Sequence, residues 1–287
     1  MRYAQLRAFH FVATYGGFSR AAEALFLTQP AISDQVRKLE DAYDILLFDR
    51  VKRQVQLTQK GTELLEITNR MFDAEAQALD YLNEYRALEA GTLRLVVDSA
   101  YHVTPILKAF QARYPAIIIS LRVGNSEEVT KALQDYSADI GVLGELSAVS
   151  KFEVLPLGES PLIAFAAKAG VFGKKVRMSY AELAEAPLVM REQGSKTRQK
   201  LEAAAGRALV PSIVAEGREA VREIVAAGNG IGFVSTAEFG QDARLRPISL
   251  PSPALLMQES LICIKARRER RLIKAFMQMA ATYSASR

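Results

Sequence analysis

The chain has 287 residues, of which 49% are hydrophobic, and its 37 lysines and arginines exceed its 32 aspartates and glutamates. This length allows two or three domains with sizeable cores, and the composition excludes an intrinsically disordered protein. No apolar run is long enough to span a bilayer, the N-terminus lacks the apolar stretch of a signal peptide, and a single cysteine excludes a disulfide framework. We therefore expect a cytoplasmic protein, whose formal net charge of +5 permits nucleic acid as a partner.

Three helices are predicted at the N-terminus. Residues 3–15 carry apolar side chains at helical spacing, and residues 18–41 predict two shorter helices separated by a tight turn. We expect Ser19 and Thr28 to cap these two helices, with Pro30 in the first turn of the second one. The second helix has an apolar face and an opposite face of polar and basic side chains: Gln29, Ser33, Gln35, Arg37 and Lys38. Such side chains suit DNA base edges and phosphates, although an ordinary helix pair with a solvated outer face would show the same pattern.

A two-stranded wing is predicted directly after these helices. Residues 49–58 alternate in part between apolar and polar side chains, and they carry Arg50, Lys52 and Arg53 at the expected tip. A basic tip of this kind contacts the DNA backbone, which sets the register of the protein on DNA and makes binding salt-dependent. The alternative is a solvated charged hairpin, which fits its place after a helix-turn-helix less well.

A long helix is predicted from Thr58 to about Leu88, about 45 Å in length at about 1.5 Å per residue. Apolar residues repeat along it at alternating intervals of three and four: Leu64, Ile67, Met71, Ala74, Ala78, Tyr81, Tyr85 and Leu88. A second apolar stripe comprises Leu65, Phe72, Leu79 and Leu82. Heptad spacing favours a partner helix, so we expect a symmetric homodimer, with packing against the chain's own C-terminal half as the alternative.

Strands and helices alternate from Gly91 onward. The predicted strands are 93–97, 117–123, 139–143, 162–167, 187–191, 212–215, 231–234 and 261–265, and the predicted helices are 104–114, 127–136, 197–205, 218–227 and 268–283. This alternation is typical of a parallel α/β sheet. We expect two similar lobes, with the chain crossing between them near residues 159–162 and returning near residues 264–267.

Polar side chains gather where these predicted strands end and helices begin, which is where open α/β sheets bind ligands. The candidate binding residues are Asp98, Ser99, Tyr101, His102, Asn125, Ser126, Glu145, Arg191, Ser195, Thr197, Arg198 and Arg218. Helix starts and arginines suit an anion, and Asp98 or Glu145 suits an amine. The alternatives are a surface charge for Arg218 and a hydrogen-bonded structural role for His102.

Signatures of catalysis are missing from the sequence. It contains no phosphate-loop motif, no nucleophile elbow and no Cys-x-x-Cys pair. Its two histidines are His10, on a helix of the first domain, and His102, so no metal cluster or Ser-His-acid set is predicted. We expect neither an enzyme nor a metal or other cofactor.

Taken together, these features resemble the LysR-type bacterial transcriptional regulators. The segments that carry the resemblance are 18–25, 28–33, 35–36, 39–40, 47–50 and 57–61. The resemblance implies an all-α winged helix-turn-helix DNA-binding domain at 1–58, a linker and dimerisation helix at 59–90, and an α/β effector-binding domain at 91–287. The last of these would resemble a two-lobed periplasmic binding protein, with lobe I at about 91–161 and 266–287 and lobe II at about 162–265.

The resemblance also implies the partners of this chain. Double-stranded promoter DNA would be bound by Ser19, Thr28, Gln29, Pro30, Ser33, Gln35, Arg37, Lys38, Arg50, Lys52 and Arg53. The chain would form homodimers, and homotetramers built from them, and would bind a small anionic or zwitterionic effector between its lobes. Residue Asp34 departs from the family pattern, which often has a basic or neutral residue there.

A narrower resemblance bears on the effector. Residues 1–10, 98–103 and 217–223 look like a LysR branch associated with 2-aminoethylphosphonate catabolism, which implies a phosphonate effector. An amino acid or a carboxylate is the alternative effector. A solute-binding protein with an N-terminal extension is the rival class of protein, and the heptad seam argues against it.

Overall fold

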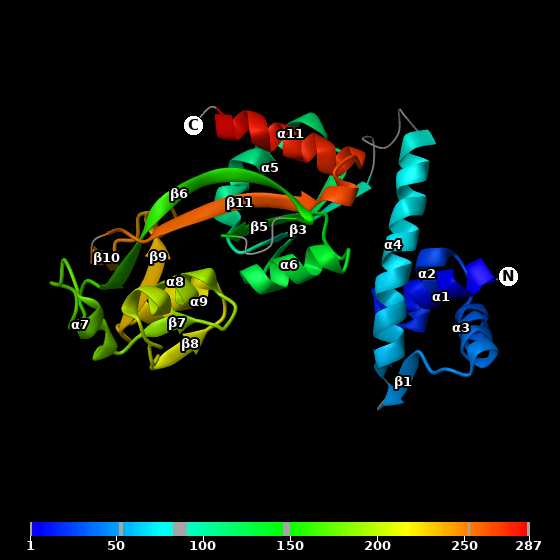
Figure 1. The fold of residues 1–287 in the computed structure, drawn as a ribbon, viewed down its shortest axis with the longest axis horizontal. Helices are drawn as coiled ribbons and strands as arrows, with labels where there is room; N and C mark the ends of the chain where they lie inside the picture. Colours follow the sequence, from blue (N-terminus) through cyan, green and yellow to red (C-terminus); the bar gives the residue numbers. More distant parts are fainter. Residues whose placement is uncertain (1, 52–53, 83–90, 146–149, 252, 286–287) are drawn as a thin grey trace. The chain divides into compact units, whose positions relative to one another are not determined.

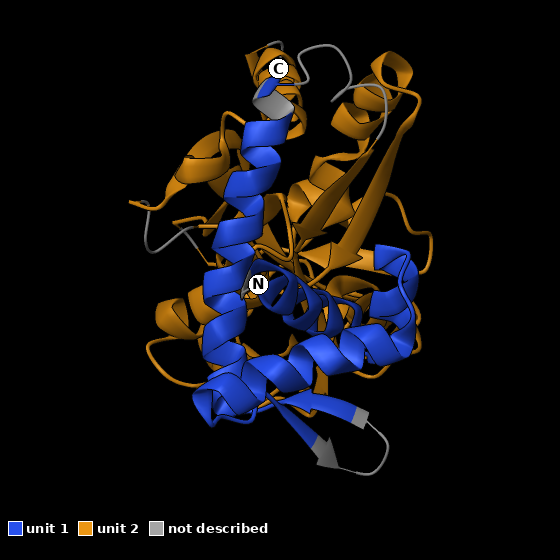
Figure 2. Ribbon diagram, turned by 90° about the vertical axis from the view of Figure 1, so that its right-hand side faces the viewer, with its two compact units in different colours: residues 1–82 blue, residues 83–287 orange. Residues whose placement is uncertain are grey.

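The computed structural model describes residues 2–51, 54–82, 91–145, 150–251 and 253–285. The chain divides into two compact units, an N-terminal unit of residues 1–82 and a C-terminal unit of residues 83–287 (Figure 2). Each unit has its own hydrophobic core, and Figure 1 labels most of the helices and strands of both. Within the described residues, no helix combines the length and apolar character needed to cross a membrane.

The N-terminal unit is a winged helix-turn-helix followed by a long helix, as predicted. Its elements are α1 (Arg2–Tyr15), α2 (Phe18–Leu25), α3 (Gln29–Tyr43), β1 (Phe48–Val51), β2 (Gln54–Leu57) and α4 (Gln59–Leu82). Strands β1 and β2 pair antiparallel to form the wing. Buried side chains from the first three helices, among them Phe9, Ile32 and Leu39, pack with Leu47 and Phe48 to form one small core.

The residues that cap the starts of α3 and α4 are the predicted ones, whereas the cap of α2 differs from the prediction. The Thr28 hydroxyl accepts a hydrogen bond of 3.4 Å from the backbone N–H three residues later, so its predicted capping role is confirmed. Thr58 accepts the equivalent bond at the start of α4, at 2.9 Å. The prediction for Ser19 is wrong, because α2 begins at Phe18 and its capping position is Gly17, two residues before Ser19 and without a side chain.

Helix α4 packs against α1 through its second apolar stripe. The Phe72 ring lies 5.9 Å from the Tyr3 ring and 4.5 Å from the His10 ring, centre to centre. His10 Nδ1 lies 3.2 Å from the Thr68 hydroxyl, and burial lowers the pKa of His10 to about 4. The helix ends at Leu82 among the described residues, and its predicted continuation through Tyr85 and Leu88 lies outside them.

The C-terminal unit alternates strands and helices. Its strands are β3 (Gly91–Val97), β4 (Ile117–Val123), β5 (Ile140–Gly144), β6 (Phe152–Ala167), β7 (Val189–Arg191), β8 (Ile213–Ala215), β9 (Ile231–Ser235), β10 (Leu245–Ile248) and β11 (Leu256–Ile264). Its helices are η1 (Ala100–His102), α5 (Thr104–Arg113), α6 (Ser126–Gln134), α7 (Tyr180–Ala184), α8 (Lys196–Ala205), α9 (Gly217–Ala226), α10 (Thr236–Phe239), η2 (Lys265–Arg267) and α11 (Arg271–Ala285).

The main sheet of this unit is mixed, so the prediction of a parallel sheet is wrong for four of its seven described strands, β6, β9, β10 and β11. Strand β3 lies parallel to β4 and β5, whereas β6 and β11 are antiparallel to each other and β11 is antiparallel to β5. Strands joined by a single crossover helix, α5 or α6, must run parallel. Strands β6 and β11 are instead separated in sequence by the whole second lobe, and that long connection returns the chain in the opposite direction.

Two long strands connect the lobes (Figure 1). Strand β6 starts beside β11 in lobe I and ends beside β9 and β10 in lobe II, and β11 leads back to β5. The pairing of β6 with β11 shifts register between Glu259 and Ser260, opposite Gly158, whose φ of +131° favours glycine. The chain therefore crosses between the lobes inside continuous strands rather than in connecting loops.

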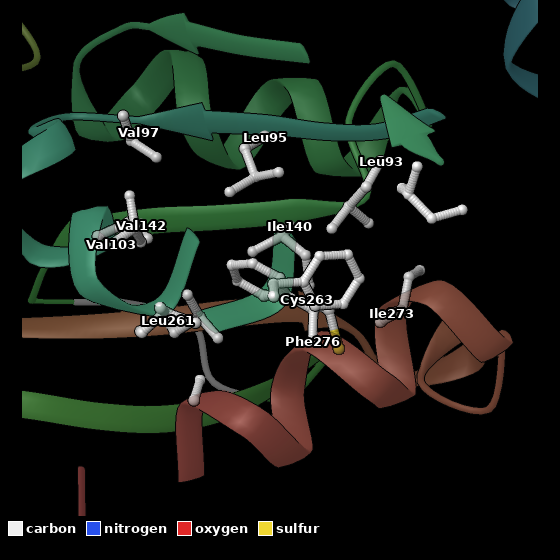
Figure 3. Close-up of a cluster of buried hydrophobic side chains, with 14 residues drawn as sticks. Leu93, Leu95, Val97, Val103, Ile140, Val142, Leu261, Cys263, Ile273 and Phe276 are labelled. Atoms are coloured by element: carbon white, nitrogen blue, oxygen red, sulfur yellow. The ribbon is translucent and has the colours of Figure 1, made fainter. Parts of the chain in front are cut away.

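Lobe I has a closely packed core between its sheet and α5 and α11. Figure 3 shows Leu95, Ile140 and Phe276 in this cluster, together with Cys263. Burial raises the pKa of the Cys263 thiol to about 11, as expected for a small apolar core side chain. Lobe II has its own core, which includes Leu188, Leu201 and other buried aliphatic residues.

A buried ion pair supports lobe I beside this core. Arg267, 1% exposed, places Nη2 2.6 Å from Asp139 Oδ1 and donates to the Ala138 carbonyl at 2.8 Å. Arg94 donates to the same carboxylate from the other side, at 2.9 and 3.1 Å. Burial alone would raise the pKa of Asp139, but the hydrogen bonds and charges of Arg94 and Arg267 hold it below its usual value.

Candidate DNA-binding surface and effector cleft

Helix α3 separates its apolar and polar side chains as the sequence predicts. Ile32, Val36 and Leu39 are buried against the rest of the N-terminal unit. The residues predicted to contact DNA from this helix are exposed or half-buried: Gln29, Pro30, Ser33, Gln35, Arg37 and Lys38. One face of α3 is thus fixed by the core, and the other presents hydrogen-bonding and positively charged groups to a partner.

Asp34 lies in the middle of that polar face and pairs with two of its cations. Its carboxylate oxygens are 3.0 Å from Arg37 Nη2 and 2.7 Å from Lys38 Nζ. The hydrogen bonds from Lys38 and Arg37 lower the pKa of Asp34, so it is ionised at neutral pH. Exposed pairs of this kind are weak, and a phosphate can replace the carboxylate as the partner of either cation.

The other residues predicted to contact DNA lie on α2, at the start of α3 and on the wing, and the structure describes the side chains of only some of them. Ser19, in the first turn of α2, and Thr28, at the start of α3, are both exposed. At the wing, the side chain of Arg50 and the whole of Lys52 and Arg53 lie outside the described residues.

The region where the two lobes of the C-terminal unit meet, the predicted effector cleft, contains five buried or nearly buried ionisable residues, here called the charge cluster. Asp98 follows β3, His102 ends η1, Arg218 begins α9, Glu238 lies on α10 and Glu259 on β11. The side chains of the three acids are at most 5% exposed, that of His102 is 7% exposed and that of Arg218 is 17% exposed. Residues from both lobes and from a connecting strand therefore meet at one point.

Arg218 links two of the acids in this cluster. Its Nε lies 3.1 Å from Glu238 Oε2, its Nη2 lies 3.5 Å from Asp98 Oδ2, and its Nη1 donates to the Asp98 carbonyl. The backbone N–H of Gly144 also donates to Asp98 Oδ2, at 3.2 Å. The sequence assigned Arg218 to an anionic ligand group and Asp98 to an amine, whereas the structure pairs these two residues with each other.

Burial and neighbouring charges move the pKa values of this cluster apart. Burial, with the charges of Asp98 and Glu238, raises the pKa of Glu259 to about 9. Burial would also raise the pKa of Glu238, but the imidazole of His102 and the charge of Arg218 lower it to about 2. Burial raises the pKa of Asp98 despite its pairing with Arg218. Of the two acids that contact Arg218, Glu238 is therefore ionised at neutral pH, whereas Glu259, the third acid of the cluster, holds its proton.

The second predicted group lies at the start of α8. Ser195 and Thr197 are buried there, and the side chain of Ser195 makes no capping hydrogen bond to the helix. The two arginines are already paired: Arg191 contacts Glu192 at 2.6 and 2.7 Å, and Arg198 donates to Glu202 and to the Arg191 carbonyl. The backbone and hydroxyl groups of this helix start thus remain the better candidates for an anion than its guanidinium groups.

Other predicted cleft residues have structural partners. The Asn125 side chain caps α6 by accepting from two backbone N–H groups, and its amide donates to the Gln193 carbonyl at 3.3 Å. Ser126 is buried within the first turn of α6. Glu145 is exposed and lies 2.9 Å from Lys200 Nζ, whose charge and hydrogen bond lower its pKa. Asn125 and Glu145 thus lie in contacts between the lobes.

Ser99 and Tyr101 lie next to the charge cluster. The Ser99 hydroxyl accepts from the Tyr101 backbone N–H at 3.4 Å, and a hydrogen bond to Ser99 is among the contacts that lower the pKa of Glu238. Tyr101 is 48% exposed, and its ring lies edge-on to the His102 ring at 5.2 Å.

Sequence reasoning missed Glu238 and Glu259. For Glu259 a signal exists, because alternate residues of β11, Met257, Glu259 and Leu261, all point inward, so the acid occupies a core position of a strand. Glu238 lies three residues after buried Ser235 at the end of β9, and it accepts a hydrogen bond from that hydroxyl at 2.9 Å. Nothing in the sequence indicated that these two acids meet.

Comparison with known families identifies both units. Residues 3–62 match the model of the bacterial regulatory helix-turn-helix proteins of the lysR family, and residues 86–285 match the LysR substrate binding domain. The chain belongs to the LysR family of bacterial transcriptional regulators. LysR-family regulators bind promoter DNA and small effectors and are not enzymes, so the predicted family and the absence of enzyme activity are confirmed.

Individual relatives agree with this assignment. The chain is 33% identical over 236 residues to the RuBisCO operon transcriptional regulator of Allochromatium vinosum, covering 80% of this chain and 78% of that protein. Full-length OxyR from Pseudomonas aeruginosa has the same fold, with a TM-score of 0.79, 17% identity and coverage of 98% of this chain and 94% of that one. The regulatory domain of Synechocystis CcmR, in complex with 2-PG, covers 68% of this chain and 97% of its own, with 22% identity and a TM-score of 0.59.

Proposed function

We propose that this LysR-family regulator is a cytoplasmic protein that reads promoter DNA with the polar face of α3 and responds to a small anionic or zwitterionic metabolite held between its lobes. The observation that carries this proposal is the division of α3. Ile32 and Val36 fix one face in the core, so that Gln29, Arg37 and their neighbours project together from the opposite face. A helix of this kind fits the major groove.

The DNA contacts divide by chemistry. Gln29, Ser33 and Gln35 carry amide or hydroxyl groups suited to base edges, and they would provide sequence preference. Ser19, Thr28 and Pro30, at the starts of α2 and α3, would lie beside the DNA backbone. The cationic residues Arg37, Lys38, Arg50, Lys52 and Arg53 would contact phosphates and provide affinity that falls with salt.

Salt dependence separates these two roles. For the full-length protein on a promoter duplex, Arg50→Ala and Arg53→Ala should each lower the slope of log affinity against log salt by about one unit. Gln29→Ala should leave that slope unchanged and reduce the preference for the promoter over unrelated DNA. An unchanged slope in both arginine variants would remove the wing from the mechanism.

We also propose a homodimer through α4, and a homotetramer built from two such dimers. Although Phe72 packs against α1, this helix leaves Ile67, Leu79 and Leu82 at least 53% exposed. Ile67 lies on the predicted heptad seam, and Leu79 and Leu82 lie on the second apolar stripe beside it. A seam of this kind, widened by a second exposed stripe, favours a second copy of the same helix. In sedimentation experiments Leu79→Glu should shift the protein toward monomer, and Glu66→Gln, an exposed polar change on the same helix, should not.

The effector would bind where α8 meets the cleft. Its first turn presents backbone N–H groups that no Ser195 side chain caps, and Ser195 and Thr197 add buried hydroxyls. A helix start of this kind binds phosphonate, phosphate or carboxylate groups through N–H donors and the helix dipole. Asp98, on the other side of the cleft, would approach an amine on the same ligand.

Two compounds are the first to test. The narrower sequence resemblance favours 2-aminoethylphosphonate, and the similar fold of CcmR, whose regulatory domain binds 2-PG, favours that compound. An amino acid or a simple carboxylate is the alternative. Saturation at about one hundred times the dissociation constant stabilises a protein by about 2.7 kcal/mol, which a thermal shift of the C-terminal unit detects.

The variants for this screen are Ser195→Ala and Thr197→Val, which should reduce the shift for any anionic ligand. Asp98→Asn should reduce it more for an amine-containing ligand than for a simple anion. If millimolar 2-aminoethylphosphonate gives no shift, the phosphonate assignment is wrong. If no anion gives one, the α8 site is wrong, whereas the DNA-binding proposal is unaffected.

A further inference from the structure

Three side chains of the charge cluster direct one atom each toward a common point. His102 Nε2 lies 3.3 Å from Glu238 Oε1 and 3.8 Å from Glu259 Oε1, and all three atoms lie within 4.8 Å of one another. The side chains are 7%, 4% and 2% exposed, respectively. This is the one group of histidine and acidic residues with metal-ligand spacing in the part of the chain that the structure describes.

The same three atoms have no hydrogen-bond partner. Among the described residues, His102 Nε2, Glu238 Oε1 and both carboxyl oxygens of Glu259 are buried without one, although His102 and Glu238 are close. Leaving a buried polar group unsatisfied costs roughly 1–3 kcal/mol, so native proteins rarely do so without another ligand. The unsatisfied atoms here are the atoms that a bound cation would use.

We propose that His102, Glu238 and Glu259 bind one divalent transition-metal cation of the Zn²⁺ type. Zinc binds imidazole nitrogen and carboxylate oxygen at about 2.0–2.2 Å, which places tetrahedral donors roughly 3.4 Å apart. The two distances measured from His102 Nε2 bracket that value. An imidazole donor selects such an ion over Mg²⁺ and Ca²⁺, which prefer oxygen ligands alone.

The charges around the site favour a dication. Asp98, Glu238 and Glu259 supply three carboxyl groups and Arg218 one guanidinium. Once an entering cation has displaced the protons of these acids, including that of Glu259, the group carries two net negative charges. Arg218 does not occupy the site, because its Nε contacts Glu238 Oε2 and leaves Oε1 to the ion. The Ser235 hydroxyl donates to the same Oε2 at 2.9 Å, and such outer contacts orient a metal-binding carboxylate.

The positions of the ligands give the ion a mechanical consequence. His102 belongs to lobe I and Glu238 to lobe II, and Glu259 lies on β11 at the register shift where that strand passes between the lobes. A cation bound to all three would tie the lobes together and stabilise this arrangement of the cleft. Metal availability would then act on the same lobe closure as the effector does.

Titration of the untagged full-length protein after removal of metal by a chelator tests the site. Calorimetry with Zn²⁺ should show one ion per chain, and Co²⁺ should give the visible absorption of a low-coordinate nitrogen and oxygen site. His102→Gln and Glu259→Gln should each weaken Zn²⁺ binding at least tenfold. Since the chain has two histidines, His10→Gln is the matched control and should bind as the wild type does.

Three results would overturn the proposal. The first is no Zn²⁺ or Co²⁺ binding at tens of micromolar metal. The second is binding that persists in His102→Gln and Glu259→Gln proteins that retain the wild-type circular dichroism spectrum. The third is stabilisation by 2-aminoethylphosphonate that Glu259→Gln abolishes while Zn²⁺ has no effect, which would make the cluster a pocket for an amine.

Discussion

The polar face of α3 and the charge cluster of the cleft both combine acids and bases, but they differ in burial. On α3, Asp34 holds Arg37 and Lys38 at the surface, where each side chain is at least 36% exposed. In the cleft, Arg218 holds Asp98 and Glu238 out of contact with bulk water. Exposed pairs exchange partners at little cost, whereas a buried charge that loses its partner is strongly destabilising.

This difference assigns separate tasks to the two units. The N-terminal unit can give its cations to DNA phosphates without unfolding, because its stability comes from the apolar core beneath α3. The C-terminal unit cannot release its charges singly, so a ligand that enters the cleft must replace the partners that it displaces. Under the proposed function, binding there would be coupled to the arrangement of the lobes.

The largest effect should come from the buried pair in lobe I. Asp139→Asn removes the carboxylate charge that contacts Arg267, 1% exposed, and should lower the unfolding free energy of the C-terminal unit by about 3–5 kcal/mol. Differential scanning calorimetry should show a lower transition temperature for that unit and an unchanged one for the N-terminal unit. A loss below about 1 kcal/mol would contradict the claim that this buried ion pair stabilises the C-terminal unit.

Replacing one arginine by methionine in each unit compares directly how much a buried and an exposed ion pair contribute to stability. Arg218→Met should cost the C-terminal unit about 2–3 kcal/mol, because Asp98 and Glu238 stay buried without the guanidinium. Arg37→Met should change the stability of the N-terminal unit by less than about 0.5 kcal/mol while weakening DNA binding. Chemical denaturation measures the change in unfolding free energy in both variants. Similar losses in the two would contradict the distinction between exposed pairs that exchange partners and buried pairs that cannot.

Removal of the acid on α3 should strengthen DNA binding. Asp34→Asn frees Arg37 and Lys38 from their carboxylate partner and removes a negative charge that faces phosphate. The slope of log affinity against log salt should become steeper by up to about one unit, measured by fluorescence anisotropy. Weaker binding by this variant would show that Asp34 positions the two cations rather than competing for them.

A further prediction concerns the pH dependence of the stability of the N-terminal unit. The pKa of His10 falls from its ordinary value of 6.5 to about 4 on burial against Phe72, so the unfolded chain takes up this proton first. The stability of this unit should therefore decline as pH falls from about 6.5 toward 4. His10→Phe keeps an aromatic ring in place and should flatten the decline; an equal decline in that variant would assign it to other groups.

Much of the N-terminal unit was predictable because its signals are local. The Thr28 cap, the spacing of Ile32, Val36 and Leu39, and the basic residues of α3 all lie within one short segment. Each of these features acts through contacts a few residues apart, so the sequence alone shows them. The misplaced cap at Ser19 is of the same local kind and shifts the start of one helix by two positions.

The cleft was predictable only in outline, because its chemistry depends on contacts between distant residues. The sequence indicated Asp98, His102 and Arg218 as cleft residues, but not that Arg218 pairs with Asp98 from 120 residues away. The direction of β11 and the position of Glu259 on it follow from the long excursion through lobe II, which no local pattern encodes. The candidate residues Asp98, His102 and Arg218 therefore lie near one another, but they contact protein groups that the sequence did not indicate.

Anisotropy titration of a duplex selected by the wild-type protein from a random pool tests the reading of DNA by α3 most directly. Gln29→Ala and Ser33→Ala should each reduce the preference for that duplex over a scrambled one by about tenfold, with the salt slope unchanged. Unaltered preference in both variants would contradict the assignment of sequence recognition to the polar face of α3.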